Sequence, residues 1–126
     1  MTAPWVSPRR VDVVVDNPSW VLGYANELVG AINDGGDDCR LVRQYEDLAP
    51  DSIVLLLGCT RIAPAFVLSQ SFRTLVVHES SLPLGRGFSP ATWQVLDGAT
   101  EIPICLVEAS VKPDEGPVVF RRSFRL

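Results

Sequence analysis

The chain lacks any long uninterrupted apolar run, although 47% of its 126 residues are hydrophobic. No stretch approaches the roughly 18 residues that cross a bilayer, and the N-terminus shows no signal-peptide pattern. We therefore expect a cytoplasmic protein with no membrane partner. A chain of this length is large enough for one domain with its own core. We assign that domain to residues 1–126 and interpret residues 1–9, which carry two prolines, as a loose leader.

A surplus of basic residues is also missing, since 11 Lys and Arg face 15 Asp and Glu, for a net charge of −4. An acidic protein is poorly suited to hold nucleic acid by neutralising phosphates, so we expect no nucleic-acid partner. Arg121, Arg122 and Arg125 are interpreted as part of a solvated C-terminal tail. The high apolar content of a short chain also favours a homo-oligomer in which another copy covers a hydrophobic face.

The three cysteines, Cys39, Cys59 and Cys105, are too few and too irregularly spaced for a zinc template. We expect reduced, mostly buried thiols and no metal. Cys59 lies in Gly-Cys-Thr and is a possible nucleophile, but the sequence holds a single histidine, so no second one is left to activate it. Filling of the core is the favoured interpretation for this thiol.

Glycine is absent from the first strand-to-helix turn, which runs from Val15 to Trp20. Dinucleotide-binding folds need glycines there so that the backbone can approach a pyrophosphate. A NAD or FAD site is therefore disfavoured, and the sequence has no P-loop lysine motif either.

What the sequence does contain is a regular alternation of strand and helix patterns. β-branched and apolar runs predict strands at 11–15, 39–45, 53–57, 75–78, 102–107 and 118–120. Helices are predicted from Pro18 with Asn17 as the cap, from about residue 64 to 69, and from Pro90 to Leu96 with Ser89 as the cap. This order predicts a three-layer α/β/α Rossmann-like fold with a mostly parallel sheet. The short turn at residues 112–116 makes the last strand antiparallel.

The most informative stretch begins where an apolar strand reaches His78, the only histidine. The following loop is punctuated by Pro83, Gly85, Gly87 and Pro90, and open α/β sheets bind ligands at such strand ends. A lone histidine is more often a buried residue with a satisfied hydrogen bond, but this position favours a functional one. Asp114 lies in a Pro-Asp-Glu-Gly turn, where an acidic residue is common for structural reasons alone.

Two other groups of residues compete poorly for a catalytic role. Ser80 and Ser81 lack the glycines of a nucleophile elbow. Glu79 and Glu108 have nothing in the sequence that places them together as a carboxylate pair, and they are interpreted as surface or strand-end charges.

An ordered set of motifs resembles the folate-dependent formyltransferases, a group that includes enzymes acting on methionyl-tRNA, glycinamide ribonucleotide and amino sugars. The motifs are His78-Glu79-Ser80-Ser81-Leu82-Pro83, Gly85-Arg86-Gly87-Phe88-Ser89-Pro90, Trp93, Asp97-Gly98 and Asp114-Glu115-Gly116. Any one of them is weak, but their order and spacing over residues 73–120 are fairly specific. The resemblance implies transfer of a formyl group from 10-formyltetrahydrofolate to a primary amine, with an amino sugar or nucleotide sugar as the expected acceptor.

The resemblance also implies the site residues. His78 takes the place of the family histidine, which polarises the formyl oxygen. Asp114 takes the place of the family aspartate, which orients that histidine. The residues expected to line the folate and substrate cleft are Leu82, Pro83, Gly85, Arg86, Gly87, Ser89 and Pro90.

One departure from the family pattern concerns the asparagine two residues before the histidine, because Val76 stands there. Thr74 and Ser80 are possible auxiliary donors in its place. This departure keeps an alternative open, namely a non-catalytic relative that binds a folate or a nucleotide sugar as a subunit or regulator. A third, weaker interpretation is a response-regulator-like or other flavodoxin-type interaction domain. Such a domain needs an acidic phosphoacceptor cluster at its strand ends, and here Asp16 alone supports one.

Overall fold

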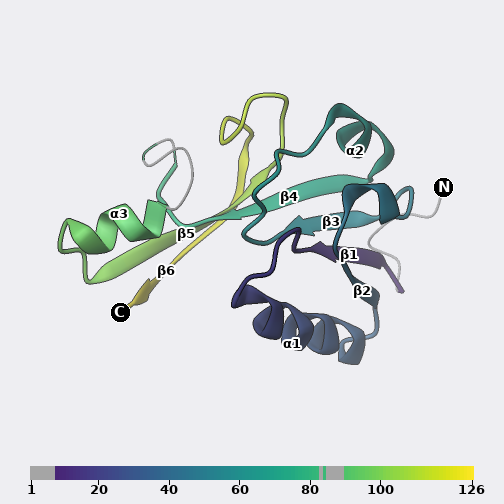
Figure 1. Cartoon of the computed structure of the whole chain (residues 1–126), viewed down its shortest axis with the longest axis horizontal. Coiled ribbons are helices and arrows are strands. Elements are labelled where there is room, and N and C mark those ends of the chain that lie inside the picture. Colours follow the sequence, from purple (N-terminus) through teal and green to yellow (C-terminus); the bar gives the residue numbers. More distant parts are fainter. Residues whose placement is uncertain (1–7, 83, 85–89) are drawn as a thin grey trace. The chain divides into compact units, whose positions relative to one another are not determined.

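A computed structural model of the chain describes residues 8–82, 84 and 90–126 (Figure 1). The strands are β1 (Arg10–Val14), β2 (Asp38–Val42), β3 (Ile53–Leu56), β4 (Arg73–His78), β5 (Glu101–Glu108) and β6 (Val118–Arg125). The helices are α1 (Val21–Asp34), α2 (Ala65–Gln70) and α3 (Pro90–Leu96), with a short 3-10 turn at Tyr45–Asp47. The hydrogen-bonded strand order is β2-β1-β3-β4-β5-β6. The predicted mostly parallel sheet with an antiparallel C-terminal strand is confirmed.

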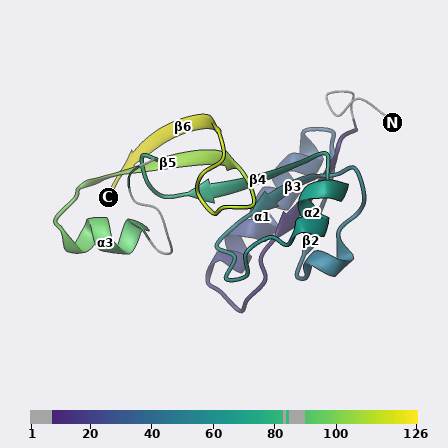
Figure 2. The same ribbon diagram turned by 90° about the horizontal axis from the view of Figure 1, so that it is seen from above.

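The chain divides into two compact units, residues 1–75 and residues 76–126. In the N-terminal unit, β1 pairs in parallel with both β2 and β3. Alternation along β1 directs Val11, Val13 and Val15 to one face, where the apolar side chains of α1 cover them. Figures 1 and 2 show α1 and α2 on opposite sides of these strands, so this unit has three layers.

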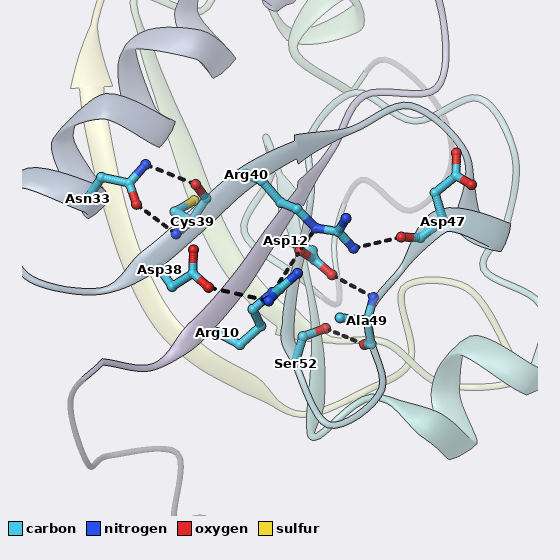
Figure 3. Close-up of polar contacts among 9 residues, drawn as sticks. All are labelled: Arg10, Asp12, Asn33, Asp38, Cys39, Arg40, Asp47, Ala49 and Ser52. Atoms are coloured by element: carbon cyan, nitrogen blue, oxygen red, sulfur yellow. Dashed lines mark hydrogen bonds and ion pairs between the residues drawn. The ribbon is translucent and has the colours of Figure 1, made fainter.

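The other face of β1 buries a carboxylate. Asp12 is fully buried, and its oxygens accept hydrogen bonds from Arg40 Nε at 2.8 Å and from the Ala49 backbone N–H at 3.0 Å (Figure 3). Arg40 also donates to the Asp47 carbonyl at 2.6 Å, and the hydrogen bond to Asp12 raises the pKa of its guanidinium. A buried charge is tolerated only when it is paired and hydrogen-bonded. Asp12 therefore ties β1 to β2 and to the segment after the 3-10 turn.

The C-terminal unit is built on the antiparallel hairpin of β5 and β6 (Figure 2). Cys105 and Val107 of β5 are buried together with Leu82, and Val118 packs against them. The register shifts between Leu106 and Val107, which is the signature of a β-bulge.

The C-terminal arginines are exposed to solvent, as predicted, but the interpretation of this segment as a tail is wrong. Arg121, Arg122 and Arg125 belong to β6, which pairs with β5 over its whole length. Phe120 and Phe124 of the same strand stay 57% and 42% exposed. Coverage of this edge by another copy of the chain stays a prediction.

The start of the first helix also differs from the prediction. α1 begins at Val21, and Asn17 does not cap it. The Asn17 amide instead donates to Asp16 Oδ1 at 2.8 Å and to the Gly58 carbonyl at 2.9 Å. It therefore links the ends of β1 and β3 and does not cap the helix. Ser19 takes over at the helix start, where its hydroxyl oxygen accepts the Val21 N–H at 3.2 Å.

The predicted leader lies mostly outside the described residues. Its last residue is nevertheless anchored, since the Arg9 guanidinium forms an ion pair with Asp37 at 2.6 Å and the Arg9 carbonyl accepts the Asp38 N–H. Among residues 8–82, 84 and 90–126, no helix combines the length and the hydropathy that a membrane span requires.

Candidate active site

His78 is the last residue of β4 and is 6% exposed. Its Nδ1 lies 3.5 Å from Oδ1 of Asp114, so the structure brings together the two residues that the family motifs single out. The separation is within ion-pair range and slightly longer than an optimal N–H to oxygen hydrogen bond. Nδ1 is thus the ring nitrogen of His78 that faces the carboxylate.

The loop between β5 and β6 positions Asp114 through a close backbone contact. A Cβ at position 116 would overlap the carbonyl oxygen of Glu108, so only glycine fits there. The Glu108 N–H also donates to the Pro117 carbonyl at 2.9 Å and closes the loop. Asp114 itself has φ of 60°, a left-handed conformation that Asp tolerates better than most residues. The Asp-x-Gly spacing therefore has a steric cause in this fold.

Side chains from three elements hold the segment that follows His78. Gln94 of α3 donates to the Glu79 carbonyl at 2.7 Å, and the Cys105 thiol of β5 donates to the Ser80 carbonyl at 2.9 Å. Arg121 of β6 donates to the Leu82 carbonyl at 2.9 Å. These three side-chain hydrogen bonds to backbone carbonyls fix a segment that is neither helix nor strand. We call the three donor residues the anchors of this segment.

These three anchoring residues escaped the sequence-based prediction. Gln94 and Cys105 act through side-chain contacts to distant backbone, which no local pattern reveals. For Arg121 a signal existed in its surroundings, because Val118, Phe120 and Phe124 recur at even spacing, as on one face of a strand, and indicate a strand rather than a tail.

The two auxiliary donors proposed from the sequence have different surroundings. Thr74 is buried, and its hydroxyl already shares a 2.6 Å hydrogen bond with the Ser71 hydroxyl. Ser80 is 2% exposed, and its Oγ is a buried side-chain oxygen without a hydrogen-bond partner in the described part of the chain.

Other residues predicted to line the cleft are only partly described. Leu82 is buried in the small core with Cys105 and Val107. Pro90 is buried as the first residue of α3, and its carbonyl accepts a hydrogen bond from Gln94. Pro83, Gly85, Arg86, Gly87 and Ser89, including the predicted Ser89 cap, lie outside the described residues.

A second polar cluster lies at the ends of β1 and β3 in the N-terminal unit. The Asp16 carboxylate accepts the backbone N–H groups of Thr60 and Arg61 at 2.9 and 2.8 Å, besides the Asn17 amide. Burial alone would raise the pKa of Asp16, but these hydrogen bonds outweigh it and lower the pKa below its ordinary value of 3.8. Asp16 therefore holds the ends of β1 and β3 together through these hydrogen bonds, and we call it the Asp16 clamp.

Cys59, next to this cluster, does not have the properties of a nucleophile. Burial, reinforced by the charge of Asp16, raises the pKa of its thiol to about 11. Its Sγ donates to the Val14 carbonyl at 3.4 Å. A thiol with such a pKa is neutral at pH 7, and the thiolate is the nucleophilic form.

Comparison with known proteins finds relatives of one kind. A methionyl-tRNA formyltransferase from Geotalea daltonii is 31% identical over 85 residues, which cover 67% of this chain and 27% of that relative. The chain is therefore similar in sequence to the folate-dependent formyltransferases. It spans about a quarter of the length of the curated relatives it matches. No protein-family model matches the chain.

Solved structures agree in fold. HypX from Aquifex aeolicus in complex with tetrahydrofolic acid superposes with a TM-score of 0.74 at 19% identity, over 93% of this chain and 21% of HypX. A candidate sugar N-formyltransferase from Mycobacterium tuberculosis gives a TM-score of 0.63 at 21% identity, over 93% of this chain and 55% of that one. The three-layer formyltransferase arrangement predicted from the sequence is therefore confirmed.

Proposed function

We propose that the chain carries the catalytic site of an enzyme that moves a formyl group from 10-formyltetrahydrofolate to a primary amine. The observation that carries this proposal is the buried His78–Asp114 pair at the end of β4, with 3.5 Å between Nδ1 and Oδ1. Similarity to the formyltransferases supplies the reaction class, and the tetrahydrofolate complex of HypX supports folate as the carrier.

The pair suits the charge changes of this reaction. The amine nitrogen attacks the formyl carbon, and negative charge develops on the formyl oxygen of the tetrahedral intermediate. Asp114 faces the imidazole at Nδ1, and in the imidazolium form of His78, in which both ring nitrogens carry a proton, Nε2 donates to that oxygen. The bond from carbon to N10 of the folate then breaks, and the proton lost by the amine is taken up as tetrahydrofolate leaves.

The acceptor is proposed to be a small amine, an amino sugar or nucleotide sugar. A net charge of −4 is a poor match for a tRNA backbone. The curated relatives are named for methionyl-tRNA, so that acceptor is the competing one. Purified protein incubated with 10-formyltetrahydrofolate and either nucleotide-linked amino sugars or methionyl-tRNA should form a formylated sugar, detected as a mass gain of one formyl group. Product from methionyl-tRNA alone would reverse the choice of acceptor.

A non-catalytic binding role is the second candidate. It is favoured by Val76, which offers no donor at the position of the family asparagine, and by the Thr74 hydroxyl, which is already engaged by Ser71. Calorimetric titration with tetrahydrofolate, run beside the transfer assay, separates the two roles. Tight binding without a formylated product from any acceptor would establish the binding role and refute the catalytic one.

A further inference from the structure

β6 is an edge strand of the C-terminal unit. It stands last in the strand order, and in the described part of the chain it pairs with β5 alone (Figure 2). Every residue of the strand after Val118 is exposed. Alternate residues of an edge strand direct their backbone N–H and C=O groups outward, where a further strand can pair with them.

One face of β6 presents a guanidinium group between two aromatic rings. The register with β5 is regular from Phe120 to Arg125, and alternate residues of a strand share a face. Phe120, Arg122 and Phe124 therefore lie on the same face. Their partners on β5 are all apolar, namely Leu106, Ile104 and Ile102.

The charges of β6 are not balanced within the chain. Arg122 and Arg125 lie on the strand without an ion-pair partner in the part of the chain that the structure describes. Glu101, the β5 partner of Arg125, accepts the Ser123 hydroxyl at 2.7 Å instead. Four arginines of the N-terminal unit are each ion-paired, namely Arg9, Arg10, Arg40 and Arg61. With no acidic residue of its own, β6 offers guanidinium groups to an outside carboxylate.

A polypeptide strand that carries carboxylates fits this edge better than two other occupants. Its backbone supplies both N–H donors and C=O acceptors, whereas the phosphate oxygens of a nucleic acid only accept. A second copy of this chain, which the apolar content favoured, would place the arginines of two β6 strands side by side, and like charges on neighbouring strands repel. The arginines also disfavour pairing with uncharged strands, so they select a partner by charge.

We propose that β6 binds an extended acidic segment of a different protein as an additional strand. Carboxylates of that segment pair with Arg122 and Arg125, and its apolar side chains lie beside Phe120 and Phe124. This inference goes beyond the formyl transfer proposed above and does not depend on it.

The test measures binding of the full chain to fluorescein-labelled peptides by fluorescence anisotropy. The probe peptide is Thr-Glu-Val-Thr-Glu-Thr-Val-Thr, which places Val, Glu and Val opposite the face of Phe120, Arg122 and Phe124. Its counterpart has Lys in place of both Glu residues. The chain should bind the Glu peptide about 10-fold more tightly than the Lys peptide, because attractive charge pairs become repulsive ones. Added salt should reduce this preference, since it screens exposed charges.

Variants of β6 locate the binding surface. Arg122→Glu and Arg125→Glu should each weaken binding of the Glu peptide by about 3- to 10-fold and strengthen binding of the Lys peptide. Lys112→Glu makes the same charge change at an exposed residue outside the strand, so both affinities should stay at the wild-type value.

A third comparison tests pairing through the backbone. Two forms of the Glu peptide carry N-methyl groups on one or the other set of alternate amides. Only one set of N–H groups in an added strand faces its neighbour, so one form should lose binding and the other should keep it.

The contrary outcomes are distinct. Equal affinity for the Glu and Lys peptides, equal effects of Arg122→Glu and Lys112→Glu, or equal binding of the two N-methylated forms would each overturn the proposal. A dimer at micromolar concentration that Arg122→Glu disperses would assign the edge to a second copy. Tighter binding of fluorescein-labelled oligothymidylate than of the Glu peptide would assign it to nucleic acid. No readout involves formyl transfer, so failure of the proposed function would leave this inference standing.

Discussion

The strand ends of the two units carry polar clusters of opposite character. In the N-terminal unit, the Asp16 carboxylate accepts two backbone N–H groups and a side-chain amide, and its oxygens serve to hold the ends of β1 and β3 together. In the C-terminal unit, His78 and Asp114 face each other at 3.5 Å, and the buried Ser80 hydroxyl has no hydrogen-bond partner within the part of the chain that the structure describes. Internal hydrogen bonds that satisfy a carboxylate indicate a structural role, whereas a buried pair of titratable side chains at a strand end is typical of a functional one.

This difference predicts where mutations separate activity from stability. Replacing the clamp should change stability with little effect on chemistry. Replacing residues at the end of β4 should change chemistry with little effect on stability.

The largest effect is expected for His78→Ala. Loss of the imidazole removes the donor that Nε2 presents to the formyl oxygen, so kcat for formyl transfer should fall by about 1,000-fold or more. Tetrahydrofolate binding measured by calorimetry should survive, because the interaction acts mainly in the transition state. Asp97→Asn, an exposed acid at the end of α3, should keep wild-type kcat. Equal activity of His78→Ala and wild type would remove His78 from the mechanism.

The next largest effect is expected for Gly116→Ala. The added Cβ would overlap the Glu108 carbonyl oxygen, so the loop must move and carry Asp114 away from His78. We expect kcat to fall by about 10- to 100-fold, since misplacement by about 1 Å suffices for such losses. Kinetics and the heat of unfolding should be measured on the same preparation.

Gly23→Ala is the matched control for that change. Nothing lies within 4 Å of a Cβ added at Gly23 inside α1, so this variant should gain about 0.5–1 kcal/mol in the free energy of unfolding. Its formyl transfer should stay at the wild-type rate. Gly116→Ala with full activity would show that the Asp-x-Gly spacing does not position Asp114.

In the N-terminal unit, Asp12→Ala should destabilise the fold without changing the rate of formyl transfer. Removal of the buried carboxylate leaves the Ala49 N–H unpaired and breaks the hydrogen bond with Arg40. We expect the free energy of unfolding in urea to fall by about 2–4 kcal/mol. Asp38→Ala removes an exposed partner of Arg10 and should cost less than about 1 kcal/mol. Equal effects of the two variants would contradict a special role for burial.

Much of the fold followed from local patterns. The valine run at residues 11–15 and the apolar run at 53–57 predicted β1 and β3 because buried parallel strands are continuously apolar. β6 was predicted too short, because Arg121 and Arg122 interrupt the apolar pattern of an edge strand that water reaches. The start of α1 was missed because the Asn17 amide is used by Gly58, which is far away in the sequence.

The site was predictable to a smaller extent. The strand and the Gly/Pro-rich loop around His78 indicated a functional position without further help. Its pairing with Asp114 followed only from the family motifs, because no spacing rule joins residues on different strand connections. The anchors Gln94, Cys105 and Arg121 bind backbone carbonyls across the C-terminal unit, and such contacts depend on the finished fold.

The smallest effect on the free energy of unfolding is expected for replacement of Asp16, the clamp residue. The pH dependence of that effect tests whether this polar cluster has a structural role. Asp16→Asn keeps the shape but loses the charge that Thr60 and Arg61 stabilise, so the free energy of unfolding should fall by about 1 kcal/mol at pH 7. The folded-state pKa of Asp16 is lowered below 3.8. Its stabilisation is therefore complete above that value and is lost as the pH falls through the folded-state pKa. Urea unfolding of both proteins from about pH 7 to about pH 2 should show the two curves converging at the acid end. A difference that stays constant or grows toward low pH would mean that the ionised carboxylate is not what holds the strand ends together.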